Sequence, residues 1–174
     1  IILGKRNFIK EKKNYWKRDI QDVKDIDHIP TYNDAATKLV KYCFHFAEEN
    51  NLKIVIAGEG EKNSEHREQE LSWFRNVLNK KNINLKARNE KNFSNYRLML
   101  KSEVVVGMRT SMTREAIGYN TKVFWCNFTN RQDAGYPFFK KIKRFVLEEN
   151  SYKVFEKKLK LILKISKNSY FNYL

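Results

Sequence analysis

The sequence has few of the features that mark secreted or membrane-spanning proteins. It holds only two cysteines in 174 residues, Cys43 and Cys126, each inside an apolar segment and neither in a CxxC pair. This usage favours two reduced thiols in a cytosolic protein over a disulfide framework or a sulfur metal site. No apolar run approaches the roughly 20 residues that a membrane-spanning helix needs. A signal peptide is also missing and residue 1 is Ile, so we expect a fragment of a longer chain.

Acidic residues are scarce relative to basic ones. The chain has 35 Lys and Arg against 20 Asp and Glu, which gives a formal net charge of +15. Such a charge raises affinity for phosphate-rich partners. However, 25 of the 35 cations are Lys, whereas proteins that read nucleic acid usually concentrate Arg and aromatic residues on one module. We therefore expect an anionic ligand or an anionic membrane surface, and a basic nucleic-acid-binding module is the alternative.

Short apolar runs alternate with longer amphipathic segments along most of the chain. The runs that predict buried strands are 53–58, 83–87, 103–107 and 122–127, with two further candidates at 1–4 and 144–148. The segments that predict helices are 33–50, 64–79, 94–101, 111–119 and 151–166. This alternation predicts an α/β fold, namely a Rossmann-like, mainly parallel sheet of about five or six strands with helices on both faces. We expect one domain over residues 1–174, with an amphipathic helix and tail over 151–174.

The most informative turn follows the third predicted strand, where Gly107 ends the strand and Thr110 or Ser111 can cap the next helix. Ligands of open parallel sheets bind beyond the carboxyl ends of the strands. Free backbone N–H groups and the positive end of the helix dipole favour a phosphate or diphosphate there. The N–H groups in question belong to Ser111, Met112 and Thr113.

Charged side chains surround this turn. Arg109 and Arg114 flank it, and either can add a charge-assisted bond to a phosphate oxygen. Glu115 follows one helical turn in, where its carboxylate is placed to accept hydrogen bonds from a pair of sugar hydroxyls. The plainer interpretation is an ordinary cap at Ser111 and an ordinary first-turn acid at Glu115 that complements the helix dipole.

No metal site is predicted. The acidic run "DID" at residues 25–27 has the composition of a Mn²⁺ or Mg²⁺ pair, but no apolar strand precedes it and no second cluster of oxygen ligands accompanies it. We interpret it as a solvated loop. The three histidines, His28, His45 and His66, share no ligand spacing.

The run "SEVVVGMRTSMTREAIGYNTKVFWCN", residues 102–127, resembles the donor-binding half of GT-B glycosyltransferases. In that class an apolar strand ending in Gly leads into a Ser/Thr turn, then Glu-Ala, then a basic and apolar strand. "TSMTREA" with "YNTKVFWCNFT" is similar to the transferases of bacterial surface-carbohydrate biosynthesis. "KIVIAGEGE", "NYRLMLKSEVVVG" and the closing "YKVFEKKLKLILKISKNSYFNYL" are also similar to segments of such domains. The resemblance covers roughly residues 50–174.

The resemblance implies that the chain binds a nucleotide-sugar donor, without a metal or other cofactor. Glu115 would bind the donor ribose. The donor phosphates would meet the amides of Thr110, Ser111 and Met112, with Arg109, Arg114, Lys5 and Arg6 nearby. The base or sugar would lie near Arg88, Asn89, Gly58, Glu59, Asn127 and Thr129. Many retaining members carry a second Glu eight positions before the ribose Glu, but this chain has Gly107 there, so the resemblance does not support that retaining mechanism.

The resemblance also implies partners beyond the donor. A glycan or lipid-linked acceptor would bind an N-terminal half that these 174 residues lack, so the catalytic residues stay unassigned and the fragment would bind donor without turnover. The protein would be cytoplasmic or peripheral on the inner face of the membrane. The Lys-rich side of the last predicted helix suits an anionic membrane, although packing of the helix on the sheet is favoured. Half of a sugar-nucleotide epimerase is a further alternative, because those enzymes share the architecture.

Overall fold

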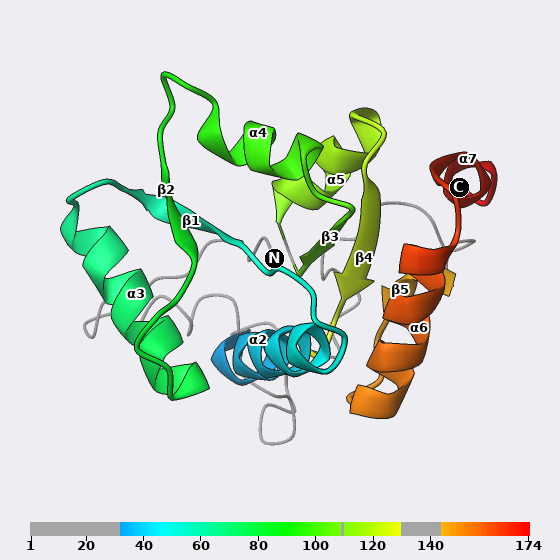
Figure 1. Ribbon diagram of the computed structural model, residues 1–174, viewed down its shortest axis with the longest axis horizontal. Coiled ribbons are helices and arrows are strands. Elements are labelled where there is room, and N and C mark those ends of the chain that lie inside the picture. Colours follow the sequence, from blue (N-terminus) through cyan, green and yellow to red (C-terminus); the bar gives the residue numbers. More distant parts are fainter. Residues whose placement is uncertain (1–31, 109, 130–143) are drawn as a thin grey trace, which may run out of the picture.

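The computed structural model describes residues 32–108, 110–129 and 144–174, in which helices and strands alternate (Figure 1). In chain order the elements are α2 (Tyr32–Glu49), β1 (Ile56–Glu61), α3 (Glu65–Leu78), β2 (Leu85–Arg88), α4 (Ser94–Leu100), β3 (Val104–Gly107), α5 (Ser111–Gly118), β4 (Lys122–Cys126), β5 (Val146–Leu147), α6 (Tyr152–Lys164) and α7 (Lys167–Asn172). The strand expected at residues 1–4, the acidic run at residues 25–27, His28, Lys5, Arg6 and Arg109 lie outside the described residues.

The described strands form two small parallel sheets. β1 pairs with β2 in one, and β3, β4 and β5 form the other in that order. The α/β class and the parallel pairing are confirmed, but the expectation of one sheet with five or six strands is wrong for this part of the chain. β1 is irregular at its end: its pairing with β2 shifts register between Ala57 and Glu61, where the backbone N–H groups of Glu59 and Gly60 bond the Glu70 carboxylate in place of a neighbouring strand.

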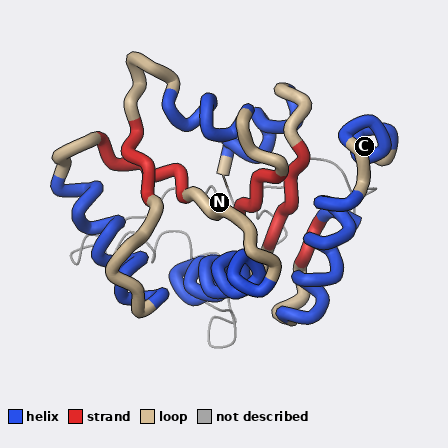
Figure 2. Tube along the Cα trace, viewed as in Figure 1, coloured by secondary structure: helices blue, strands red, loops and turns tan. Residues whose placement is uncertain are grey.

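The two sheets nevertheless share both layers of the core. Successive strand residues point to opposite faces, so Val105 and Val106 of β3 enter different clusters. The larger cluster joins all five described strands to α2, α3, α6 and α7, and the smaller joins β1, β3, β4 and β5 to α4 and α5. Helices therefore cover both faces of the strands, as the tube in Figure 2 shows. This explains why the strands read as continuous apolar runs.

The helix boundaries follow from capping residues in the sequence. Each of the five predicted helices is confirmed to within two residues. Ser64 and Ser151 cap α3 and α6 by accepting a hydrogen bond from the backbone N–H three residues later. The prediction missed α7 and treated it as a tail. Its six residues bury only Tyr170, which leaves no helical periodicity to detect.

A buried lysine joins the end of α6 to the start of β4. Lys122 Nζ donates to the carbonyl oxygens of Ile162, Leu163 and Ile165 at 2.8, 3.3 and 3.1 Å, and lies 2.6 Å from Glu103 Oε1. The carbonyl oxygens of the last helical turn receive no hydrogen bond from an N–H group of the helix itself. The ammonium group of Lys122, on a side chain that is 1% exposed, therefore caps α6 from another element.

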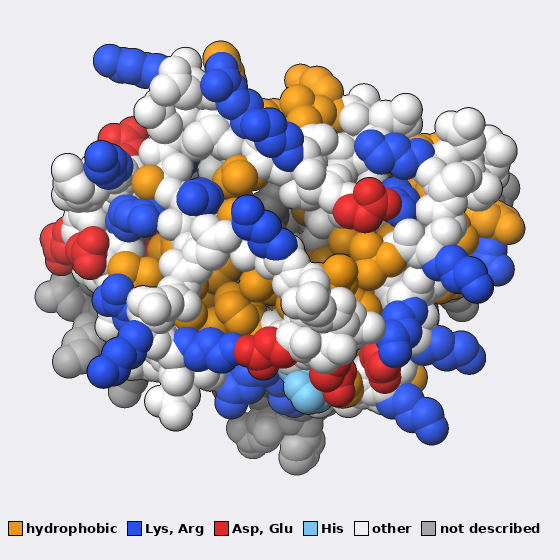
Figure 3. All heavy atoms as spheres, in the orientation of Figure 1, with side chains coloured by type: hydrophobic (Ala, Val, Ile, Leu, Met, Phe, Trp, Pro, Cys, Tyr) orange, Lys and Arg blue, Asp and Glu red, His pale blue; other side chains and the backbone are white. Residues whose placement is uncertain are grey.

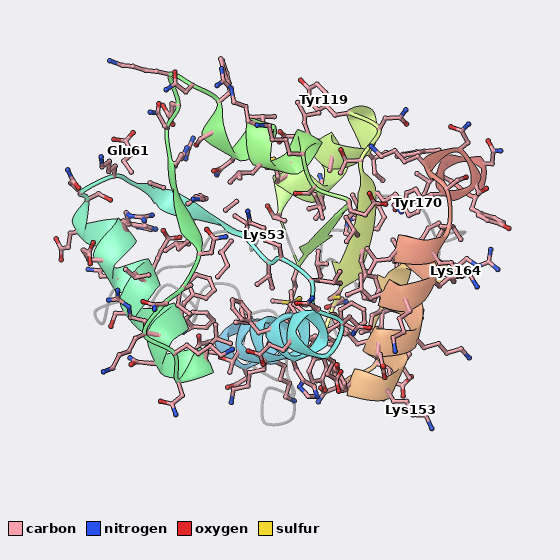
Figure 4. The ribbon with its side chains drawn as sticks, in the orientation of Figure 1. Lys53, Glu61, Tyr119, Lys153, Lys164 and Tyr170 are labelled. Atoms are coloured by element: carbon pink, nitrogen blue, oxygen red, sulfur yellow. The ribbon has the colours of Figure 1, made fainter. Side chains whose placement is uncertain are left out.

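Tyr170 completes the hydrogen bonding of β4. Its hydroxyl accepts from Val123 N at 3.1 Å and donates to Val123 O at 2.8 Å. β5 pairs with β4 only from Trp125 onward, so Val123 lies beyond the reach of the neighbouring strand. The Tyr170 ring stacks on Phe145 at 4.2 Å, and Figure 4 shows Tyr170 between α7 and β4.

We expect Tyr170→Phe to lower the free energy of unfolding by about 2 kcal/mol, because it leaves a buried donor and a buried acceptor of Val123 without their partner. Urea unfolding followed by circular dichroism measures the change. Tyr173→Phe is the matched control, since Tyr173 is 53% exposed and its hydroxyl is not in the core. Equal stability of the two variants would contradict the proposed role of the Tyr170 hydroxyl.

Candidate functional site

The helix that follows β3 begins with a compact cap. Thr110 is the N-cap of α5, and its Oγ1 accepts from Met112 N at 3.4 Å. Thr113 donates its backbone N–H and its hydroxyl to Thr110 O, at 3.3 and 2.7 Å. Two of the three amides expected to face a phosphate therefore have partners inside the turn. Ser111 N–H is the one for which the described residues provide no acceptor, and the Ser111 and Arg114 side chains are exposed beside it.

Glu115 lies between α5 and α4. Its carboxylate accepts a hydrogen bond from the Tyr96 hydroxyl, and this bond raises the pKa of Tyr96. Arg88, at the end of β2, opposes that shift because its positive charge also acts on the Tyr96 hydroxyl. The Arg88 guanidinium itself forms an ion pair with Glu90 at 2.6 Å. Tyr96, which the sequence did not single out, is the residue that faces Glu115. The remaining carboxylate oxygen, Glu115 Oε2, is buried and has no hydrogen-bond partner among the residues that the structure describes.

Tyr96 is the middle ring of three aromatic side chains. Its ring centroid is 6.2 Å from that of Phe93 and 6.1 Å from that of Tyr119, both in edge geometry. The outer two rings are 65% and 56% exposed. Orange side chains project from this edge of the surface in Figure 3, and Figure 4 shows Tyr119 pointing away from the body. A π surface therefore flanks the Glu115 carboxylate.

The backbone of Phe93 is strained. Its φ of 49° and ψ of 43° lie in the left-handed region, and as the N-cap of α4 it makes no side-chain capping bond. A bulky residue in this region is an outlier that the surrounding structure must enforce. The loop does so through Phe93 N to Glu90 O at 3.2 Å, Asn92 N to Asn89 Oδ1 at 3.2 Å and Asn89 N to Ser94 Oγ at 2.8 Å. The backbone at Phe93 is therefore fixed, while its ring stays exposed beside Tyr96.

Gly58 and Glu59, two of the residues expected near the base or sugar, do not form an open turn at the end of a strand. The strand predicted over residues 53–58 ends at Gly58, but β1 begins at Ile56 and continues to Glu61, so Gly58 and Glu59 lie within it and Gly58 is buried. Glu70, which is 4% exposed, accepts from Glu59 N and Gly60 N at 2.9 Å each. A carboxylate of the protein itself therefore fills the place that an anion would take at this glycine-rich turn.

The turn after β4 is also closed by its own side chains. Asn127 Oδ1 accepts from Thr129 N at 3.2 Å and from Thr129 Oγ1 at 2.7 Å, and Asn127 N extends the β4–β5 pairing by donating to Leu147 O at 2.7 Å. Both side chains are buried. They shape the turn, whereas the accessible groups of the site are those of Arg88, Phe93, Ser111, Arg114 and Tyr119.

Comparisons with known proteins add no family to this geometry. Within the described ranges, no three His, Cys, Asp or Glu side chains gather as metal ligands, and no helix has the length and apolar character to cross a bilayer. The chain matches no protein-family model, no curated protein and no solved structure. Any function must therefore be argued from the site itself.

Proposed function

We propose that this chain binds a nucleotide-sugar donor and forms the donor half of a GT-B-type glycosyltransferase that acts in bacterial surface-polysaccharide biosynthesis. The observation that carries the proposal is the Glu115 carboxylate beside the start of α5, which faces the Tyr96 hydroxyl and whose Oε2 is buried with no hydrogen-bond partner among the described residues. In a parallel α/β protein this is the edge where ligands bind. The shared core layers of the two sheets also fit a Rossmann-like strand order of β2, β1, β3, β4 and β5.

We assign binding of the donor ribose to the Glu115 carboxylate. A carboxylate accepts hydrogen bonds from two neighbouring hydroxyls, and such bonds to a charged group are stronger than neutral ones. In the free protein the Tyr96 hydroxyl occupies one side of this carboxylate, while Oε2 has no partner within the described part of the chain. A ribose hydroxyl would replace the tyrosine hydroxyl and a second would satisfy Oε2, once the Tyr96 side chain turns aside.

The rest of the donor has matching groups nearby. A planar base stacks on exposed aromatic rings, and Phe93 and Tyr119 offer them at 65% and 56% exposure. The Ser111 amide, the α5 dipole and Arg114 suit the diphosphate. The acceptor, a glycan or a lipid-linked glycan, and the catalytic base are assigned to the other half of such a transferase.

Titration calorimetry with UDP, GDP and CMP tests the proposal. We expect one of them to bind the chain, and Glu115→Gln to weaken that binding about tenfold, because one charge-assisted hydrogen bond becomes a neutral one. Tyr96→Phe should act in the opposite direction and tighten binding several-fold, since the ligand no longer displaces an internal bond. A merely structural Tyr96–Glu115 pair would weaken binding in both variants or in neither.

Glu65→Gln is the matched control, because Glu65 is an exposed acid in the first turn of α3. Circular dichroism establishes that each variant is folded. The proposal fails if none of the three nucleotides binds, or if Glu115→Gln and Glu65→Gln bind alike. Binding to DNA that weakens as salt rises, and that added nucleotides do not displace, would favour the nucleic-acid alternative.

A further inference from the structure

The outward face of α6 carries a row of lysines. Lys153, Lys157, Lys160 and Lys164 are all exposed and follow one another at intervals of four, three and four residues. This spacing places them on one side of a helix, along about 16 Å of its length. Figure 4 shows Lys153 and Lys164 at the two ends of α6, both directed away from the body. We name these four side chains the α6 lysine row.

The α6 lysine row is separate from the contacts that hold the helix in the fold. Phe155, Leu159 and Ile162 form the buried side of α6, which lies opposite the row. The fifth lysine of the helix, Lys158, instead turns toward the core and donates to Val146 O. Removing charge from the row therefore leaves the packing of α6 intact.

The positive charges of the α6 lysine row repel one another. Each lysine has a like-charged neighbour three or four residues away, an arrangement that destabilises an isolated helix. Within the described residues of α6, Glu156 is the single acid, and it pairs with Lys160 at 2.6 Å. Most of the positive charge of the row is therefore left for an external anionic partner.

The chemistry of the row favours an anionic bilayer over nucleic acid. It contains lysine and no arginine, and lysine acts as a point charge, whereas arginine provides the planar fork that grips individual phosphates. The outer side of one helix is convex and carries no aromatic side chain for stacking on bases. A straight row of point charges matches the diffuse negative potential of a membrane surface.

We propose that the α6 lysine row docks the protein on an anionic lipid surface. The inference does not depend on the nucleotide site, which lies on α4 and α5. Lysines near such a surface act additively, so binding is reversible and weakens as salt rises. Figure 3 shows blue side chains projecting from the side of the molecule that α6 forms.

Vesicle co-sedimentation tests the proposal with the full 174-residue chain. The probes are vesicles of phosphatidylcholine alone and of phosphatidylcholine mixed with phosphatidylglycerol. We expect the chain to sediment only with the anionic vesicles, and the quadruple variant K153Q/K157Q/K160Q/K164Q to lose roughly a hundredfold or more in partition coefficient. The thermal midpoint of that variant should equal or exceed that of the wild type, because the repulsion within the row is gone.

A second quadruple variant removes the same charge elsewhere. Lys53, Lys62, Lys81 and Lys101 are exposed and lie in loops and turns away from α6, so K53Q/K62Q/K81Q/K101Q should retain most of the vesicle binding. Equal losses in both variants would mean that net charge alone drives binding and would overturn the proposal. Absence of sedimentation with anionic vesicles, or a row that binds DNA but not lipid, would overturn it as well.

Discussion

Replacing Lys122 by methionine should lower the free energy of unfolding by about 4 kcal/mol, because the change removes the donor that satisfies three carbonyl oxygens at the end of α6. Methionine fills a similar volume, so the loss is one of hydrogen bonding and charge rather than of packing. For a chain of this size the thermal midpoint should fall by roughly 10 °C. Urea and thermal unfolding measure both quantities.

Two variants separate this effect from charge in general. Lys157→Met removes a lysine from the exposed side of the same helix, and we expect a change within about 0.5 kcal/mol. Glu103→Gln removes the ionic partner of Lys122, but Glu103 is 62% exposed, so its loss should cost less than about 1 kcal/mol. If Lys122→Met stays within about 1 kcal/mol of the wild type, the buried ammonium group does not anchor α6.

Gly60→Ala should destabilise the protein by about 3 kcal/mol. A methyl group at this position would lie 2.5 Å from Arg67 N and 2.6 Å from Arg67 Cα. Both are backbone atoms of α3, which no side-chain rotation can move, so β1 and α3 must separate. The shift would also disturb the bond from Gly60 N to Glu70 Oε2. Chemical unfolding of the variant measures the cost.

Gly118→Ala provides the matched control for the same substitution. Gly118 is the last residue of α5, and a methyl group added there meets no atom of the described residues within 4 Å. Alanine also costs less backbone entropy than glycine, so this variant should be as stable as the wild type or up to about 1 kcal/mol more stable. Similar stabilities for the two alanine variants would show that β1 and α3 can move apart at little cost in free energy.

Most of the secondary structure could be predicted because its causes are local. Residues 33–50 and 151–166 carry helical periodicity and capping residues, and the apolar runs at 103–107 and 122–127 are strands buried on both faces. The irregular end of β1 involves Glu70, whose carboxylate takes two amides of β1 from eleven and ten residues away. A glutamate inside a helical pattern gives no sign of such a contact.

The candidate site could be predicted only in outline. The strand, cap and Glu115 series located the turn after β3, and the capping residue proved to be Thr110, one of the two alternatives. Tyr96 escaped prediction because its importance comes from the packing of α4 beside α5. The closed turn of Asn127 and Thr129 likewise depends on side-chain rotamers, which periodicity does not encode.

The capping of α6 by Lys122 and the pairing of Tyr170 with β4 set an order of events during synthesis on the ribosome. Lys122 finds its carbonyl partners 40 to 43 residues later, and Val123 finds the tyrosine hydroxyl 47 residues later. While the nascent chain ends before α6, the Lys122 ammonium group and one edge of β4 therefore face water, a chaperone or another chain. Premature termination between β4 and α6 would expose this edge permanently and make the product a target for proteases and aggregation.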